Sequence, residues 1–227
     1  MKDSWADDPG QTAFPIAKAG FWYICAGVFV TLILALLQMA LPALLVLAAT
    51  FFVCFFFRDP DRVIPIVKGA IVSPADGRVV VAKKVEEPPF GEGPCLQVSV
   101  FMNIFNVHVN RCPTDGEVAQ VAHQPGRFIM AHRDDAVLKN EHNCITLTTA
   151  DGFSYHVVQI AGLVARRIIC HVAPGHTLKR GERFGLICFG SRLDLYLPAE
   201  ARLVVAKGDK VQAGSSILGY LNEQPQP

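Results

Sequence analysis

The chain has 227 residues, enough for one domain with a small appendage. Its 21 lysine and arginine residues nearly balance 20 aspartate and glutamate residues, so the net charge of +1 gives no basis for nucleic-acid binding. The seven cysteines are odd in number and form no Cys-x-x-Cys pair, which argues against a disulfide framework and against a zinc site. We therefore expect buried free thiols and no metal.

The N-terminal quarter of the chain is apolar enough to enter a bilayer. No residue in the run 21–57 is charged, and this run is long for one membrane span of about 20 residues but short for two. Pro42 lies near its middle and favours a break there. Lys18 precedes the run and Arg58 follows it, so both ends suit the cytoplasmic side of a helical hairpin. Residues 1–66 are predicted to anchor the protein to the cell membrane, either by spanning the bilayer or by re-entering it.

Beyond residue 66 the sequence changes to short runs of Val, Ile and Leu separated by Gly, Pro and Asp, which is typical of strands and turns. Strands are predicted at 69–81, 95–100, 116–123, 144–149, 154–160, 203–205 and 216–220. One short helix is predicted at 134–140, whereas 162–167 fits neither class. We expect a mainly β (α+β) domain over residues 67–227, built as a compact β-sandwich or barrel and preceded by the helical hairpin.

Three short motifs in this domain bear on its chemistry. Residues 73–77 read SPADG, residues 105–111 read FNVHVNR and residues 189–198 read FGSRLDLYLP. In the third motif, the pair Gly190-Ser191 stands where a loop enters a strand of alternating pattern. A serine hydroxyl can attack the carbonyl of the residue before it, and glycine leaves that carbonyl sterically open. A shift of the acyl group to oxygen, followed by elimination, would cut the chain and leave a pyruvoyl group on the new N-terminus.

These motifs, in this order, resemble phosphatidylserine decarboxylase proenzymes of the shorter bacterial form. The likeness runs from about residue 57 to residue 196, which is most of the chain. It implies self-cleavage between Gly190 and Ser191, after which Ser191 is the pyruvoyl cofactor. A second Gly-Ser pair, at 214–215, is not in register with the other motifs and is predicted to be a turn.

The resemblance implies an enzyme that converts phosphatidylserine in the bilayer to phosphatidylethanolamine and CO2. The amine of the serine headgroup would condense with the pyruvoyl ketone to a Schiff base, which takes up the electron pair when CO2 leaves. The two cleavage products would stay together as a heterodimer, with further oligomerisation left open. The catalytic domain is expected on the cytoplasmic side of the membrane.

The resemblance also gives roles to two further catalytic residues. Asp76 corresponds to a residue that orients a base, or acts as one, during self-cleavage, although an aspartate in such a turn often only bonds its own backbone. His108 corresponds to the histidine associated with substrate protonation and decarboxylation, a role that suits a near-neutral imidazole. The longer bacterial enzymes have a second histidine three residues later, where this chain has Arg111. The base that assists cleavage is therefore open, with His142 as one candidate.

Two alternatives remain beside this interpretation. A pyruvoyl enzyme acting on an ether-linked serine phospholipid would carry the same motifs. A membrane-tethered carrier or binding module of the lipoyl-like β type would have no chemistry of its own, but it needs a lysine at a hairpin tip, for which Lys207 or Lys210 could serve. Intact mass separates these classes, because the decarboxylase has two chains and the carrier has one.

Overall fold

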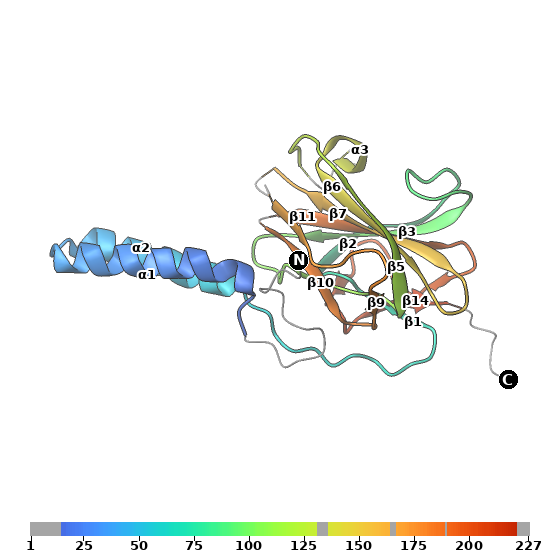
Figure 1. The fold of residues 1–227 in the computed structure, drawn as a ribbon, viewed down its shortest axis with the longest axis horizontal. Coiled ribbons are helices and arrows are strands. Elements are labelled where there is room, and N and C mark those ends of the chain that lie inside the picture. Colours follow the sequence, from blue (N-terminus) through green and yellow to red (C-terminus); the bar gives the residue numbers. More distant parts are fainter. Residues whose placement is uncertain (1–14, 131–135, 164–166, 189, 222–227) are drawn as a thin grey trace. The chain divides into compact units, whose positions relative to one another are not determined.

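The computed structural model describes residues 15–130, 136–163, 167–188 and 190–221 (Figure 1). The chain divides into two compact units, Met1–Asp61 and Arg62–Pro227. The first is helical and the second is built almost wholly of strands.

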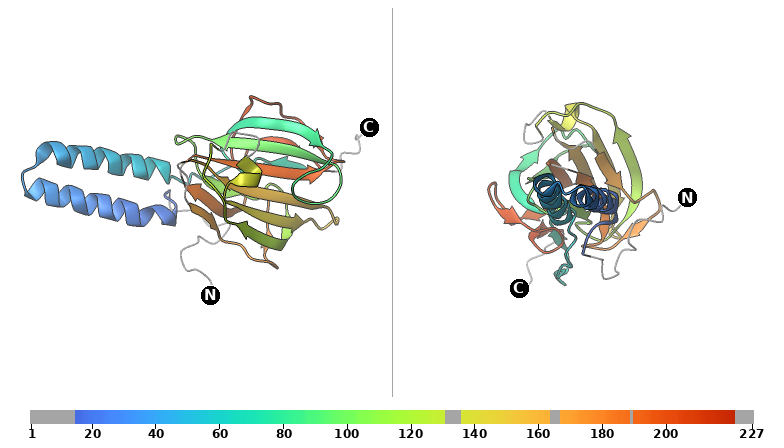
Figure 2. Two further views of the ribbon diagram at one scale, coloured as in Figure 1. Left: turned by 90° about the horizontal axis from the view of Figure 1, so that it is seen from above. Right: turned by 90° about the vertical axis from the view of Figure 1, so that its left-hand side faces the viewer.

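The first unit contains an apolar helical hairpin. The short 3-10 helix η1 (Lys18–Gly20) leads into α1 (Phe21–Leu36), and α2 (Ala40–Phe56) returns along it, as the two helices side by side in Figure 2 show. The predicted break at Pro42 is wrong by a few residues, because the chain turns at Gln38, whose φ is 58°. Pro42 instead lies in the first turn of α2, where a missing backbone N–H costs nothing.

The hairpin exposes apolar side chains over most of its length. No residue of α1 is buried, and the exposed set includes Trp22, Phe29 and Leu36. Lys18–Leu36 is long and apolar enough to cross a membrane, whereas Ala40–Phe56 is shorter.

The second unit is organised around one curled antiparallel sheet of eight strands. In spatial order the strands are β13 (Lys210–Val211), β2 (Gly77–Val85), β3 (Cys95–Met102), β11 (Ser191–Pro198), β7 (Ser154–Ala161), β6 (His142–Thr148), β5 (Gly116–Gln124) and β9 (Thr177–Leu178). One helical turn, α3 (Ala136–Lys139), lies between β5 and β6 in the sequence.

Two three-stranded sheets complete the unit. One consists of β4 (Val109–Arg111), β10 (Arg183–Cys188) and β8 (Arg167–Cys170), and the other of β1 (Ala70–Val72), β14 (Ile217–Tyr220) and β12 (Arg202–Leu203). The main core joins all three sheets, since Leu195 of the large sheet shares it with Ile187 of β10 and Leu218 of β14. The mainly β prediction is thus confirmed.

The predicted strand at 69–81 is wrong in one respect, because it is two strands in two sheets. β1 pairs with β14, whereas β2 pairs with β3, and the SPADG segment makes the bend between them. Gly77 is required at this bend, since a Cβ there would collide with the carbonyl oxygen of Phe101. β8, β9, β10 and β13 were not predicted. Of the ranges predicted to be ambiguous or helical, residues 164–166 and 134–135 lie outside the described residues.

β11 is the strand that positions the candidate site. It pairs along its length with β3 on one side and with β7 on the other. Its first residue, Ser191, is opposite Met102 at the end of β3 and opposite Ala161 at the end of β7. Because both neighbouring strands end at this level, the junction before Ser191 lies at one end of the strands of the sheet.

Candidate active site

The predicted cleavage junction has an unusual glycine followed by a fully buried serine. Gly190 has a φ of 67°, in the left-handed region, and a Cβ added there would meet nothing within 4 Å. Its backbone conformation, and not crowding, is therefore what favours glycine. Ser191 lies on the core face of β11, and its Oγ is 3.9 Å from the Met102 sulfur. A thioether is a weak acceptor, so this buried hydroxyl makes only a weak hydrogen bond.

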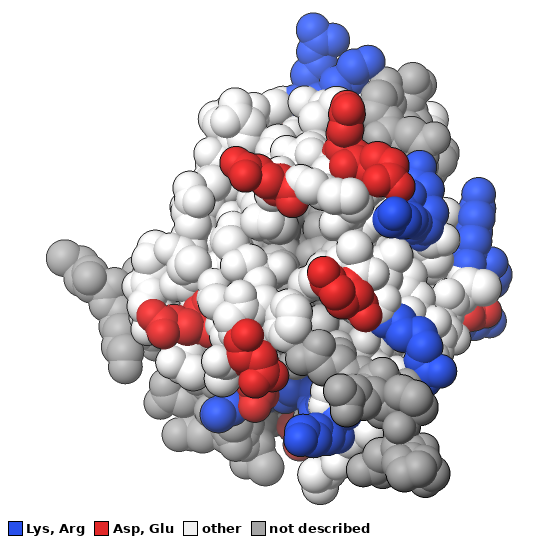
Figure 3. Space-filling model, turned by 90° about the vertical axis from the view of Figure 1, so that its right-hand side faces the viewer, with Lys and Arg blue, Asp and Glu red and all other residues white. Residues whose placement is uncertain are grey.

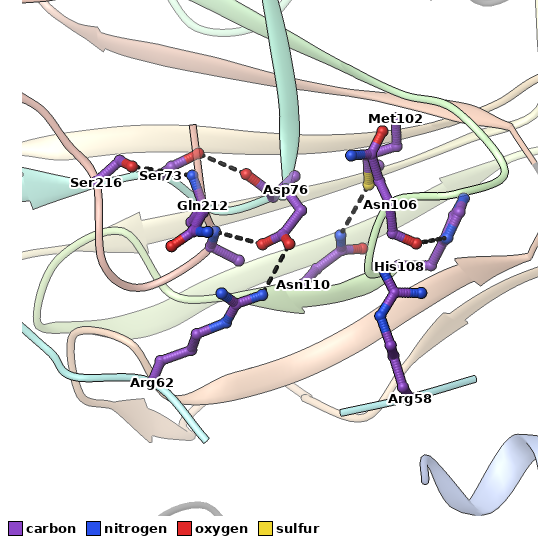
Figure 4. A network of polar contacts seen from close by, with 12 residues as sticks. Arg58, Arg62, Ser73, Asp76, Met102, Asn106, His108, Asn110, Gln212 and Ser216 are labelled. Carbon is purple, nitrogen blue, oxygen red and sulfur yellow. Dashed lines mark hydrogen bonds and ion pairs between the residues drawn. The ribbon is translucent and has the colours of Figure 1, made fainter. Parts of the chain in front are cut away.

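His108 directs one ring nitrogen at this junction. The Gly190 N–H donates to His108 Nε2 at 3.4 Å, and His108 Nδ1 lies 2.9 Å from the Asn106 carbonyl oxygen (Figure 4). A carbonyl only accepts, so Nδ1 carries the proton and Nε2 presents its lone pair. The structure thus brings His108, Gly190 and Ser191 together. The alternation of Val107, His108 and Val109 in the sequence predicts a strand through His108, but β4 begins one residue later, at Val109.

Asp76 is engaged by two other segments. Its Oδ2 accepts from the Arg62 guanidinium at 2.7 Å, and its Oδ1 accepts from the Ala213 N–H at 2.7 Å (Figure 4). The segment between β13 and β14, which contains Ala213, is tied to the SPADG turn a second time, since the Gly214 N–H donates to the Ser73 carbonyl at 2.8 Å. Asp76 therefore holds the segment between β13 and β14 against the turn.

None of the described hydrogen bonds joins Asp76 to His108 or Ser191. Arg78 and Arg192 both pair with Phe101, from opposite sides of β3. Two strand spacings, about 10 Å, therefore separate the backbone next to Asp76 from the Gly190-Ser191 junction.

Arg111, which stands at the position of the second histidine, and His142, the candidate to replace it, do not contact the Gly190-Ser191 junction in any described hydrogen bond. The Arg111 guanidinium donates to the Gly181 carbonyl at 3.0 Å, and an arginine does not give up its proton to act as a base. His142 pairs with Ile160 on the outer face of the large sheet and stacks edge-on against Phe90. It lines a shallow cavity of about 360 Å³ on that face, whereas Ser191 points to the core.

A chain of buried amides leads to the Met102 sulfur. Asn143 donates to Gln159 at 3.1 Å, and Gln159 donates to Asn110 at 2.9 Å. Asn110 in turn directs its amide at the Met102 sulfur, 3.9 Å away (Figure 4). Because all three amides are buried, their mutual bonds fix which end of each one donates. Sequence reasoning missed this chain, whose members come from three separate strands.

A buried ion pair follows the junction directly. Arg192 Nε and Nη2 each lie 2.6 Å from an Asp194 carboxylate oxygen, and Arg192 also donates to Ser99 Oγ at 3.1 Å. Both side chains lie on the face of β11 opposite the main core and are almost fully buried. Burial raises the pKa of Tyr196, with the Asp194 charge adding to the shift, so its hydroxyl remains a donor to Asp194.

Thiols offer no competing nucleophile near the junction. Burial raises the pKa of Cys188 to about 11, although the Arg167 charge opposes the shift, so this thiol is protonated near neutral pH. All seven cysteines are free. In the part of the chain that the structure describes, no three His, Cys, Asp or Glu side chains gather as a metal site would require.

Comparisons with known proteins agree with the motifs. The family model described as phosphatidylserine decarboxylase matches residues 49–219. A phosphatidylserine decarboxylase proenzyme from Desulfotalea psychrophila is 44% identical, with 93% of this chain and 99% of that protein covered. Proteins of the same name from Syntrophus aciditrophicus and Ralstonia nicotianae are 46% and 48% identical, covering 90% and 91% of this chain and 96% of each relative.

Proposed function

The chain belongs to the phosphatidylserine decarboxylase family, and we propose that it is a proenzyme that cuts itself at Gly190-Ser191 and then converts phosphatidylserine to phosphatidylethanolamine and CO2. Family membership makes the chain an enzyme, which removes the alternative of a carrier without chemistry. The observation that carries the proposal is the lone pair of His108 Nε2 at the junction, 3.4 Å from the Gly190 nitrogen.

The proposed cut uses groups already present at the junction. Ser191 Oγ attacks the Gly190 carbonyl carbon while a base takes the hydroxyl proton, and breaking the C–N bond moves the acyl group to oxygen. Loss of the Ser191 α-proton then expels the Gly190 carboxylate and leaves a dehydroalanine end. Its imine tautomer takes up one water and releases ammonia, which leaves a ketone at residue 191.

The surroundings of Ser191 fit a pyruvoyl group. The side chain is fully buried on the core face, and the strand that follows is held by ladders on both sides. Such a group would supply a ketone that condenses with the substrate amine and takes up the electron pair released with CO2. Once Nε2 has taken up a proton, His108 is suited to deliver it to the carbon that lost CO2, because the ring is already oriented by the Asn106 carbonyl.

Strand pairing supports a stable complex of the two cleavage products. The C-terminal product begins with β11, which lies between β3 and β7 of the N-terminal product. Two further strands cross between the products, since β14 pairs with β1 and β13 pairs with β2. We therefore propose that the products remain together as a heterodimer without a covalent link.

Membrane attachment is proposed for the N-terminal segment, 1–66, ahead of a decarboxylase domain over 67–227. Lys18–Leu36 has the length and composition of a membrane span, and Lys18 and Arg58 flank the apolar run. Positive charge at both ends favours a cytoplasmic location for both, and hence for the catalytic domain. An anchored enzyme suits a substrate that stays in the bilayer.

The direct test uses the purified full chain with phosphatidylserine vesicles. We expect two chains by intact mass, ending at Gly190 and starting with a pyruvoyl-blocked residue 191, together with CO2 and phosphatidylethanolamine. An ether-linked serine phospholipid, assayed in parallel, should be no better a substrate than the diacyl lipid. A single uncut chain that is nonetheless fully active would refute the proposal.

His108→Ala should remove decarboxylation. The substitution deletes the group proposed to protonate the substrate carbon, for which a loss of about 10²- to 10⁴-fold in kcat is expected. His156→Ala is the matched control, because His156 lies on the outer face beside Thr146. Mass and CO2 release, measured separately, distinguish loss of cleavage from loss of turnover. Normal turnover in His108→Ala would exclude His108 from catalysis.

Asp76→Asn should accumulate uncut chain if Asp76 takes part in processing, as the resemblance implies. The same change also deprives the largely buried Arg62 of its anionic partner, which should cost about 2 kcal/mol of stability. Arg62→Gln is the control, since it removes the ion pair but keeps the carboxylate. We expect Arg62→Gln to match the loss of stability and still cleave. Equal cleavage in both variants would leave Asp76 with a structural role alone.

A further inference from the structure

Exposed apolar side chains surround the end of the large sheet that holds Ser191. Ile104, Phe105, Met130 and Leu163 expose 38, 61, 52 and 57% of their surface. We call these four residues the apolar rim. Single exposed apolar residues are common on protein surfaces, so their location decides whether they matter.

Strand register places two parts of the apolar rim beside the junction. Met102 ends β3 and Ala161 ends β7, and both residues pair with Ser191. The loops that follow these strands carry Phe105 and Leu163, within three residues of the strand ends. Both loops therefore leave the sheet next to the proposed site.

A third loop, which contains Met130, is tied to the same end of the sheet by Asn140. The Asn140 amide donates to the Ala161 carbonyl at 2.7 Å and to the Ile129 carbonyl at 2.8 Å. Met130 follows Ile129 directly, so its exposed side chain extends from a backbone tied to the end of β7. Three loops that are distant in sequence thus present apolar groups around one site.

The first of these loops is held in shape by its own side chains. Asn103 Oδ1 accepts from the Phe105 N–H at 2.9 Å, and Asn106 Oδ1 accepts from the Asn103 N–H at 2.9 Å. The Asn106 carbonyl is also the partner of His108 Nδ1. One turn therefore exposes Phe105 while it orients the buried His108, and contact at Phe105 needs no reordering of the loop.

Charge differs between the two ends of the large sheet. At the far end, loops 86–94, 149–153 and 198–201 contain no Lys or Arg. Figure 3 shows this face, on which Lys and Arg side chains from other parts of the chain also appear. The exposed carboxylates of these loops are Glu86, Glu87, Glu92, Asp151 and Glu200, of which Glu86 pairs with Lys84 at 3.0 Å.

At the site end the described loop residues 103–108, 125–130 and 162–163 contain no Asp or Glu, and Arg127 and Arg167 are exposed. Glu141 lies close to this end but is directed at His123, 3.9 Å away. The described loops at the site end are therefore better suited to an anionic surface than the loops at the far end.

We propose that the apolar rim inserts into the headgroup layer of an anionic phospholipid bilayer and seats Ser191 over the lipid surface. This contact belongs to the catalytic domain and is additional to the N-terminal anchor; its purpose rests on the proposed function. An amphipathic protein partner would also cover apolar groups, but the charge asymmetry and a bilayer-resident substrate favour lipid.

The first test compares one substrate in two physical forms. Full-length Phe105→Ser and Leu163→Ser should each lose roughly tenfold in kcat/KM on phosphatidylserine-containing vesicles. Activity on short-chain phosphatidylserine dissolved as monomers, and self-cleavage, should be unchanged. Val204→Ser, which alters a side chain 51% exposed outside the rim, should change neither activity. Unchanged vesicle activity in both rim variants, or equal losses on both substrates, would overturn the proposal.

The second test does not depend on activity. Hydrogen exchange of the wild-type chain should slow in residues 103–108 and 162–163 when phosphatidylglycerol vesicles are added, and should not slow in 86–94 or 149–153. Absence of protection at the rim would refute lipid docking even if decarboxylation is observed. Protection at the rim in a protein that releases no CO2 would support the docking surface and refute the proposed function instead.

Discussion

Ser191→Ala should give a single uncut chain that releases no CO2. Alanine has neither the oxygen that attacks the Gly190 carbonyl nor the leaving group for the elimination, so both cleavage and cofactor formation stop. The fold should tolerate the change, because Ser191 Oγ has only a 3.9 Å contact with the Met102 sulfur to lose. Intact mass and CO2 release, with thermal unfolding as the check on folding, measure these outcomes.

The chain contains its own control for this experiment. Gly214-Ser215 repeats the local sequence, and Gly214 has a φ of 75°, close to the 67° of Gly190. The Ser215 N–H donates to the Gln212 carbonyl in a tight turn. Ser215→Ala should therefore cleave and turn over normally. If cleavage persisted in Ser191→Ala, or failed in Ser215→Ala, the assignment of the cut to Ser191 would be wrong.

The comparison of these two pairs shows why local sequence could not identify the site. Both glycines have a left-handed backbone conformation and both precede a serine. Of the two, only Gly190 donates its N–H to a histidine, His108, which lies 82 positions earlier in the sequence. The motif as a whole could be recognised, and so could the mainly β fold, because strand runs and turn residues are local signals. The assembly of the junction depends on the register of β11 between β3 and β7, which no local pattern specifies.

Strand alternation was misleading on β11 itself. Alternating Arg192, Asp194 and Tyr196 would ordinarily predict a solvent-facing side, with Leu193 and Leu195 facing the core. Both faces are buried instead, because Phe90 and the cluster around Val137 cover the outer one. A charged pair becomes acceptable there only because each oxygen of Asp194 meets a guanidinium nitrogen.

The same ion pair predicts the largest effect on stability. Asp194→Ala should destabilise the protein by about 3–5 kcal/mol, because it leaves the Arg192 guanidinium buried without its anion. That is a large part of the roughly 5–15 kcal/mol that holds a typical domain together. Urea unfolding of the full chain in detergent, monitored on β-sheet signal, measures the loss. Tyr196→Phe should cost much less, since it removes only a long 3.4 Å bond to Asp194.

The double variant Arg192→Met, Asp194→Leu separates the two possible origins of that loss. If the unpaired guanidinium is the cause, replacing both charges by apolar groups should restore most of the stability that Asp194→Ala removes. Asp194→Ala should also slow self-cleavage, because the ion pair adjoins the junction on the opposite face of β11 and holds that strand in register. The double variant should restore self-cleavage together with stability. Failure of the double variant to recover would mean that the bonds to Ser99 and Tyr196 stabilise this face, and a cost below about 1 kcal/mol for Asp194→Ala would mean that water reaches Arg192.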